Sequence, residues 1–270
     1  MTRAWIDGKP SSEGLLADRA LHYGDGLFET ISVRNSRARF LDLHAARLDD
    51  GCRRLGIVCD AGASLASSVA LLGAEARDGT LKVIVSRGDA RVRGYAPRGD
   101  EQSRVFSYWY PGAVAAPTQD LEVALLTHRW GENAQLAGMK HLNRLEQVLA
   151  RRELAASGAG EGLVLSSNGL LSSGTQCNVF LWFGDSLVTP RVDRCGIAGV
   201  MRAVVLREAA RLGLPVQVAD LPVSALAQAS ALFFTNARIG LQFATRLEGL
   251  RFERPDALLR LAAAVEALDG

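Results

Sequence analysis

One lysine stands where an amine can do covalent chemistry. Lys140 follows a short and mostly apolar stretch, Leu136 to Met139, and a helical pattern begins directly after it. Burial among apolar groups disfavours the charged form of an amine and lowers its pKa. A neutral amine attacks an aldehyde and forms a Schiff base, which is one way in which lysine acts in covalent catalysis. Lys140 is therefore the candidate catalytic residue, and the alternative is a solvated surface lysine.

The rarity of lysine separates Lys140 from an ordinary surface cation. The chain has 31 basic residues, and its lysines are Lys9, Lys82 and Lys140. Arginine supplies the remaining positive charge, but its guanidinium does not form an imine under ordinary conditions. Lys9 falls in a predicted hairpin turn, and Lys82 falls in a predicted strand whose alternation favours a solvent-facing side chain. Lys140 remains as the amine placed for chemistry.

Three weaker features fit an anion close to such an amine. Arg47 lies in a helical pattern, and the residues alone favour a solvated arginine over a phosphate ligand. Gly196–Arg202 predicts a Gly-rich entry into a helix, where unpaired amides and the helix dipole attract anions. Asn236 and Ala237 follow a buried-looking strand. Together with Lys140 these features match pyridoxal phosphate, whose aldehyde needs a lysine and whose phosphate needs donors.

Composition excludes several classes of function. A chain of 270 residues forms one large domain or two ordinary ones. A net charge of +2 is too small to indicate a nucleic-acid or membrane surface. The four cysteines form no CxxC pair and no zinc-type cluster, which predicts free thiols in a reducing compartment and no metal. With no apolar leader and no run of about 20 apolar residues, the sequence predicts a cytoplasmic protein.

The chain divides into two predicted halves that position these residues. We expect a small N-terminal α/β domain over residues 1–113, a linker over 114–120 and a larger domain over 121–270. The linker is expected there because small residues lie between two prolines.

Each half has its own predicted elements. The first half is predicted to have strands over 3–7, 28–33, 37–41, 81–88 and 104–110, and helices from His44 and over 64–77. The second is predicted to have strands over 121–127, 161–166, 179–183, 186–189 and 231–235, and helices to about 157, to about 212 and over 255–268. The helix after Lys140 is predicted to bury one stripe formed by Leu142, Leu145 and Leu149.

Several motifs resemble those of the fold-type IV pyridoxal-phosphate enzymes, which include branched-chain and D-amino acid aminotransferases and aminodeoxychorismate lyases. The motifs are D-R-A-L-H-Y-G-D-G-L-F-E-T, H-A-A-R-L, S-R-G, R-G-Y, L-A-G-M-K-H-L-N-R-L-E-Q-V-L, C-N-V-F and G-I-A-G-V-M-R. They cover nearly the whole chain, and the run after Lys140 is the most specific and most similar to the lyases. The resemblance implies a two-domain α/β (α+β) fold, with a barrel-like sheet in the larger domain, cofactor in the cleft, and a homodimer.

The resemblance also implies roles for individual residues. Lys140 would hold the cofactor as a Schiff base and transfer the proton. The reaction would convert 4-amino-4-deoxychorismate to 4-aminobenzoate and pyruvate, a step toward folate. The other implied cofactor-binding residues are Arg47 and the amides of Ile197 and Ala198, together with Asn236, Ala237, Asn178 and Ser173. The substrate would be bound by Phe28 and, in a basic loop that either is solvated or binds a carboxylate, by Arg93 and Tyr95.

Ser173 departs from the family pattern. Aligned on Asn178, it occupies the position of a glutamate that usually pairs with the protonated ring nitrogen of the cofactor. A serine can hydrogen-bond this nitrogen but should not hold it protonated, so the ring would be a weaker electron sink. This predicts little transaminase activity. The alternatives to a lyase are a D-amino acid or branched-chain aminotransferase of the same fold and a catalytically impaired homologue.

Overall fold

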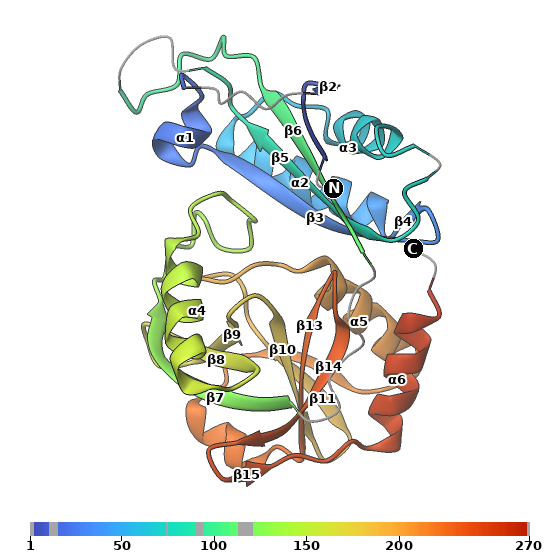
Figure 1. Ribbon diagram of the computed structural model, residues 1–270. Helices are drawn as coiled ribbons and strands as arrows, with labels where there is room; N and C mark the ends of the chain where they lie inside the picture. Colours follow the sequence, from blue (N-terminus) through green and yellow to red (C-terminus); the bar gives the residue numbers. More distant parts are fainter. Residues whose placement is uncertain (1–2, 11–15, 74, 90–93, 113–120, 269–270) are drawn as a thin grey trace. The chain divides into compact units, whose positions relative to one another are not determined.

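The chain forms two compact units, which are described separately (Figure 1). The structure, a computed structural model, describes residues 3–10, 16–73, 75–89, 94–112 and 121–268. The first unit contains the described residues up to 112 together with Met139–Asn143, and the second contains 121–138 and 144–268. The predicted linker over 114–120 lies outside the described residues, so the domain boundaries stay a prediction.

The first unit is an antiparallel sheet with helices. Its six strands run in the order β2-β1-β6-β5-β3-β4. The strands are β1 (Arg3–Ile6), β2 (Lys9–Pro10), β3 (Gly26–Arg34), β4 (Arg37–Ala38), β5 (Gly79–Ser86) and β6 (Arg104–Pro111). The helices are α1 (Arg19–Tyr23), α2 (Leu41–Leu55) and α3 (Ala61–Ala70), and α2 and α3 lie along one face of the sheet (Figure 1).

The two faces of this sheet carry different residues because side chains alternate along a strand. On the helix-covered face the residues are buried, among them Glu29, Ile31 and Val83. On the opposite face, register places Phe28 beside Ile84 and Phe106, and Thr30 beside Lys82 and Tyr108, and all six are half-buried. β3 therefore sends Phe28 to one face and Glu29 to the other.

The second unit is built on a nine-stranded sheet. Its order is β12-β11-β10-β13-β14-β7-β8-β9, and β15 pairs with β14. Register shifts in β7, β8 and β14 bend the sheet, which confirms the predicted mixed α/β fold with a barrel-like sheet. The strands are β7 (Leu121–Trp130), β8 (Glu161–Ser166), β9 (Leu171–Gly174), β10 (Asn178–Phe183), β11 (Ser186–Pro190), β12 (Val216–Ala219), β13 (Ala231–Asn236), β14 (Gly240–Leu247) and β15 (Leu250–Arg251). The helices are α4 (Leu145–Ser157), α5 (Val200–Arg211), the 3-10 helix η1 (Val223–Gln228) and α6 (Asp256–Glu266).

Apolar packing fixes this second sheet. The rings of Phe180 on β10 and Phe233 on β13 are stacked, with centroids 5.0 Å apart, and both are fully buried. Aromatic pairs of this kind add stability beyond the area that they bury. The core thus lies under the strands whose ends carry Asn178 and Asn236.

Three predicted elements of the first unit have wrong boundaries. The helix α3 begins at Ala61, because the Asp60 side chain accepts from the amide of Ala63 and caps it, and the helix ends at Ala70 rather than Arg77. The strand predicted over 37–41 is two residues long, and α2 begins at Leu41 rather than near His44.

The predicted buried stripe of α4 is also wrong. Leu145 is 78% exposed, and Val148 and Leu149 are exposed as well, whereas Ala150 and Leu154 are buried. Periodicity identified the helix but not its inward face, because leucines also occur on the outward side. An apolar stripe on α4 is therefore open to another surface.

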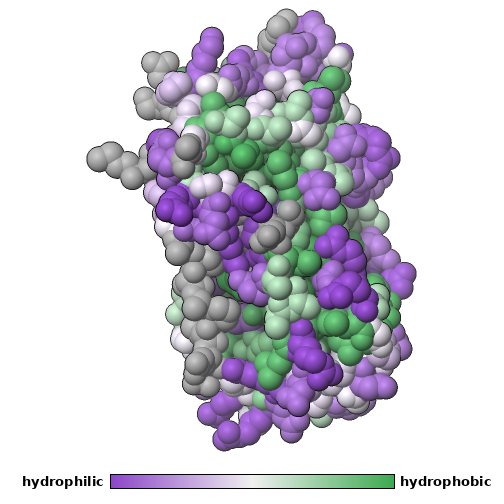
Figure 2. All heavy atoms as spheres, turned by 90° about the vertical axis from the view of Figure 1, so that its right-hand side faces the viewer, coloured by the Kyte–Doolittle hydropathy of each residue, from purple (hydrophilic) through white to green (hydrophobic). Residues whose placement is uncertain are grey.

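Hydrophobic side chains also reach the surface between hydrophilic ones on the face drawn in Figure 2. Within the described residues, no helix is both long and apolar enough to cross a membrane. The same part of the chain has no group of three or more His, Cys, Asp or Glu residues able to hold a metal ion.

Candidate functional site

Lys140 is held by the sheet of the first unit. The amide of Phe28 donates to the carbonyl of Lys140 at 2.9 Å, and the amide of Leu142 donates to the carbonyl of Gly26 at 3.0 Å. Between these two bonds, Leu27 and His141 form an antiparallel bridge. The backbone on both sides of Lys140 is therefore fixed to the start of β3.

The Lys140 side chain lies over an aromatic ring. Its Nζ is 4.2 Å from the centroid of the Phe28 ring, a distance at which a charged amine is attracted to the ring face. Lys140 and Phe28 are both half-buried. The structure thus brings together the predicted catalytic lysine and one predicted substrate-binding residue.

Lys82 shares the same ring, which the sequence did not predict. Its Nζ lies 5.4 Å from the Phe28 centroid, and its side chain is half-buried rather than solvated. The register of β3 and β5 explains this, because Lys82 pairs with Thr30, two residues after Phe28 on the same face. Within the described part of the chain Lys82 has no acidic partner. It is a cation available to an anionic ligand on this face.

Arg47 is fixed by a buried carboxylate on the opposite face of β3. Its Nε donates to Oε1 of Glu29 at 2.9 Å and its Nη2 to Oε2 at 2.5 Å, and His44 Nδ1 lies 2.5 Å from the same Oε2. The Arg47 side chain is 13% exposed, so the solvated arginine favoured by the residues alone is not what the structure shows.

Charge outweighs burial at this carboxylate. Burial raises the pKa of Glu29, but the charge of Arg47 and the hydrogen bonds from His44 and Arg47 lower it to about 2. Glu29 is therefore anionic at neutral pH and holds the Arg47 guanidinium in one orientation. A fixed guanidinium is well suited to bind a phosphate.

In the second unit, Ser173 is part of a hydrogen-bonded pair. The buried Ser173 hydroxyl donates to the carbonyl of Gly174 at 2.8 Å and accepts from Nε1 of Trp130 at 2.8 Å. Its one proton is therefore used within the protein. The side chain offers a ligand only a lone pair and no negative charge, so it would stabilise a protonated ring nitrogen far less than a carboxylate does.

The segment before α5 is pinned by main-chain bonds. The amide of Ala198 donates to the carbonyl of Gly138 at 3.0 Å, and the amide of Gly138 donates to the carbonyl of Gly196. Asn178 Nδ2 donates to the carbonyl of Ile197 at 2.9 Å. The Ala198 amide, predicted as a phosphate ligand, thus already has one protein acceptor. The Asn178 side chain anchors the segment through the carbonyl of Ile197.

The first turn of α5 keeps several donors without acceptors. No acceptor lies within reach of the amides of Val200 and Met201 in the described ranges, and the buried Nε of Arg202 also has no partner there. At Gly199, an added Cβ would lie 2.1 Å from Oδ1 of Asn178, so only glycine fits. Open amides at a helix N-terminus are a ready site for an anion.

The remaining predicted residues are placed as follows. Asn236 ends β13, and its Oδ1 accepts from the amides of Arg238 and Ile239, so its side chain builds the turn that contains Ala237. Tyr95 is 84% exposed. Arg93 lies outside the described residues.

Sequence reasoning missed Glu29, His44, Lys82 and Trp130. One signal was present for Glu29, since a charged residue inside an apolar strand implies a buried partner. The three-residue spacing of His44 and Arg47 places both on one side of a helix and is the matching signal. Lys82 and Trp130 depend on strand register, which the sequence does not reveal.

The chain is similar to several known proteins along most of its length. The amino-transferase class IV family matches residues 26–247 of the chain. The solved structure of 4-amino-4-deoxychorismate lyase from Pseudomonas aeruginosa is 37% identical, with a TM-score of 0.92, and the match covers 99% of this chain and 100% of that one. Aminodeoxychorismate lyase from Vibrio harveyi is 28% identical over 88% of both chains. D-alanine aminotransferase from Bacillus licheniformis is 27% identical over 87% of this chain and 83% of that one.

The Glu29–Arg47 pair leads to a prediction about stability. We expect Arg47→Met to lower the free energy of unfolding at pH 7 by about 3 kcal/mol, because it leaves a buried carboxylate without its cation. The loss should shrink as the pH falls from about 4.5 toward 2, since Glu29 then becomes protonated in the wild type as well. Urea unfolding at several pH values measures this.

The matched control for this prediction is Glu29→Gln, which removes the charge that needs a partner. In that background Arg47→Met should cost much less. An equal cost of Arg47→Met with and without Glu29→Gln would show that the carboxylate does not hold the arginine.

Proposed function

Because the chain belongs to the class IV aminotransferase family, we propose that it is a pyridoxal-phosphate-dependent lyase that converts 4-amino-4-deoxychorismate to 4-aminobenzoate and pyruvate. The observation that carries the proposal is the likeness to the Pseudomonas lyase over the full length of both chains. An aminotransferase of the same fold is less supported, since the D-alanine aminotransferase is 27% identical against 37% for the Pseudomonas lyase, and Ser173 has no negative charge to hold a ring nitrogen protonated.

The residues of the chain fit the cofactor. Pyridoxal phosphate needs a lysine and anion donors, and the chain has a half-buried Lys140, a fixed Arg47 and orphaned donors at the start of α5. Lys140 would bind the aldehyde carbon. Arg47 would bind the phosphate, helped by the amide of Ile197 and by Asn236 and Ala237. The amide of Ala198 is bonded to Gly138 instead, Asn178 supports the segment, and Ser173 would pair with the ring nitrogen. When bound, the group withdraws electrons from the carbon that bears the substrate amine.

Lys140 then acts as the base. Its neutral amine would remove the proton from the ring carbon that bears the substrate nitrogen. The electron pair of that bond makes the ring aromatic and expels the enolpyruvyl oxygen, and the enol takes a proton to become pyruvate. Aromatisation supplies the driving force, so a strongly electron-withdrawing cofactor ring is less necessary.

The first unit has groups for the two carboxylates of this substrate. Lys82 offers an ammonium beside Phe28, and Phe28 would contact the substrate ring. Arg93 and Tyr95 would bind the second carboxylate. An anion close to Lys82 is attracted more strongly than one close to a fully exposed lysine, because half-burial reduces screening by water.

We also propose a cytoplasmic homodimer acting in folate biosynthesis. The support for a dimer is the exposed apolar stripe of Leu145, Val148 and Leu149 on α4. No nucleic acid, membrane or metal partner is expected.

A coupled assay tests the function. Purified protein with pyridoxal phosphate is expected to release pyruvate from 4-amino-4-deoxychorismate and to release far less from D-alanine with 2-oxoglutarate. The second arm reports transamination, which Ser173 disfavours. Faster turnover of D-alanine would identify an aminotransferase, and no turnover of either substrate would favour an impaired homologue.

Lys82 leads to a second prediction. Lys82→Met is expected to raise KM for the substrate at least tenfold and to change kcat less than threefold, because a charge-assisted contact to a carboxylate is lost in binding. Steady-state kinetics measures both. Lys9→Met is the control, since Lys9 is exposed on the short strand β2 and its substitution should leave KM unchanged. An unchanged KM in Lys82→Met would remove Lys82 from the substrate site.

A further inference from the structure

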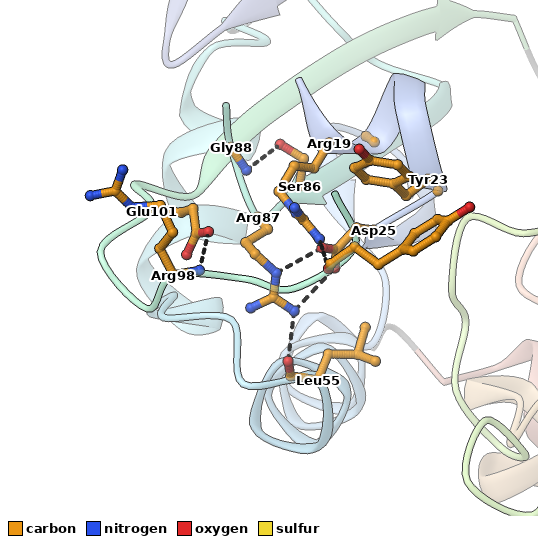
Figure 3. A network of polar contacts seen from close by, with 12 residues as sticks. Arg19, Tyr23, Asp25, Leu55, Ser86, Arg87, Gly88, Arg98 and Glu101 are labelled. Atoms are coloured by element: carbon orange, nitrogen blue, oxygen red, sulfur yellow. Dashed lines mark hydrogen bonds and ion pairs between the residues drawn. The ribbon is translucent and has the colours of Figure 1, made fainter. Parts of the chain in front are cut away.

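Two buried arginines share one carboxylate in the first unit. Arg19 Nε donates to Oδ2 of Asp25 at 2.7 Å, while Arg87 donates to the same oxygen at 2.8 Å and to Oδ1 at 3.1 Å (Figure 3). Arg19 is 3% exposed and Arg87 is 8% exposed. Burial raises the pKa of Asp25, but its bonds to Arg87 and Arg19 lower it overall, so the carboxylate is anionic. Arg19, Asp25 and Arg87 have no part in the chemistry proposed for Lys140.

Arg19 extends from Asp25 to the basic loop. Its Nη2 donates to the carbonyl of Tyr95 at 2.6 Å and its Nη1 to the carbonyl of Gly94 at 3.4 Å. Its guanidinium also lies over the ring of Tyr23, 4.9 Å from the centroid. Arg19 reaches the carboxylate and the two carbonyls with three different nitrogens of its fork, whereas the three donors of a lysine all lie on one nitrogen.

Tyr23 makes a second connection to the same loop. Its hydroxyl accepts from the amide of Gly94 at 3.3 Å, and its ring centroid is 5.4 Å from that of Tyr95. Arg19 and Tyr23 together therefore hold the backbone that directly follows Arg93. The Tyr95 side chain itself stays exposed.

The same turn contacts the segment of the catalytic lysine. Gly24 follows Tyr23, and its carbonyl accepts from Nδ2 of Asn143, three residues after Lys140, at 3.3 Å. A Cβ on Gly24 would lie 2.4 Å from Oδ1 of Asn143, so the Asn143 side chain lies directly against the Gly24 backbone. A continuous set of direct contacts thus leads from the Lys140 segment to the loop.

Arg87 leads to a different place, although it shares Asp25. Its Nη1 donates to the carbonyl of Gly56 at 2.8 Å and its Nη2 to that of Leu55 at 2.7 Å, at the C-terminal end of α2 (Figure 3). Among the described residues, its side chain makes no hydrogen bond or ion pair with 94–99. Arg87 therefore provides a matched control: a buried arginine on the same carboxylate that does not touch the loop.

We propose that Arg19, anchored by Asp25, is a positioning residue for substrate recognition, which holds the main chain of Gly94 and Tyr95 so that Tyr95 is presented to a substrate carboxylate. The inference rests on the proposed function, in which Tyr95 binds that carboxylate. It assigns Arg19 no part in the chemistry of Lys140.

The test compares Arg19→Met with Arg87→Met, and Arg19→Lys with Arg87→Lys in case a methionine variant fails to fold. Hydrogen exchange of peptides covering residues 94–102 reports the loop, and pyruvate release reports KM and kcat. Equilibrium dialysis measures how tightly the holoenzyme binds isophthalate, which has two carboxylates, and benzoate, which has one. The ratio of the two affinities reports recognition of the second carboxylate.

We expect both Arg19 variants to exchange faster over 94–102, to raise KM at least tenfold with kcat within threefold, and to lose the preference for isophthalate. Both Arg87 variants should keep KM and the preference within threefold of wild type, whatever their stability. Equal effects at Arg19 and Arg87, or a looser loop with unchanged KM and isophthalate binding, would overturn the proposal. If the wild type releases no pyruvate, the proposed function fails, and the exchange and isophthalate measurements still decide the role of Arg19.

Discussion

The pairing of the Lys140 backbone with the start of β3 is the constraint on which the site depends. The two main-chain bonds to Phe28 and Gly26 fix where the amine begins, and the Phe28 ring limits where it can point. The next residue along the strand, Glu29, faces the other way and holds Arg47. Because side chains alternate along a strand, one short stretch of β3 orients both the amine and the guanidinium.

Close to Lys140 the chain passes from the second unit into the first. Gly138 pairs with Ile197 of the second unit, whereas Lys140, only two residues later, pairs with β3 of the first. Each unit supplies different chemistry. The first has the amine and cations in fixed orientations, and the second has open donors at the start of α5 and a serine whose proton is already used. Under the proposed function, Lys140 would form the imine and Ser173 would be a weak partner of the ring nitrogen. This combination would favour an elimination driven by aromatisation over amino-group exchange.

Much of this could be predicted from the sequence because it is local. The apolar approach to Lys140 and its rarity singled out the lysine, and the strand over 161–166 has the predicted limits. The predictions that were wrong depend on contacts between residues that are distant in the sequence. Arg47 was predicted to be solvated because its partner, Glu29, lies on another element. Lys82 was predicted to face solvent because the strand register that places it beside Phe28 cannot be read from the sequence. The leucines of α4 follow helical spacing but face outward, since periodicity does not say which stripe is covered. The roles of Ser173, Ile197, Ala198, Asn236 and Ala237 came from resemblance and stay predictions.

Reduction of the holoenzyme with borohydride, followed by peptide mapping, tests the central claim most directly. Reduction makes the bond between the cofactor and its amine permanent, so the modified lysine can be read from the mass of one peptide. Lys82 is the main alternative site of attachment, since its amine lies near the same Phe28 ring as that of Lys140. The pairing with β3 predicts the label on Lys140 alone. A label on Lys82 or Lys9, or no label in protein saturated with cofactor, would contradict it.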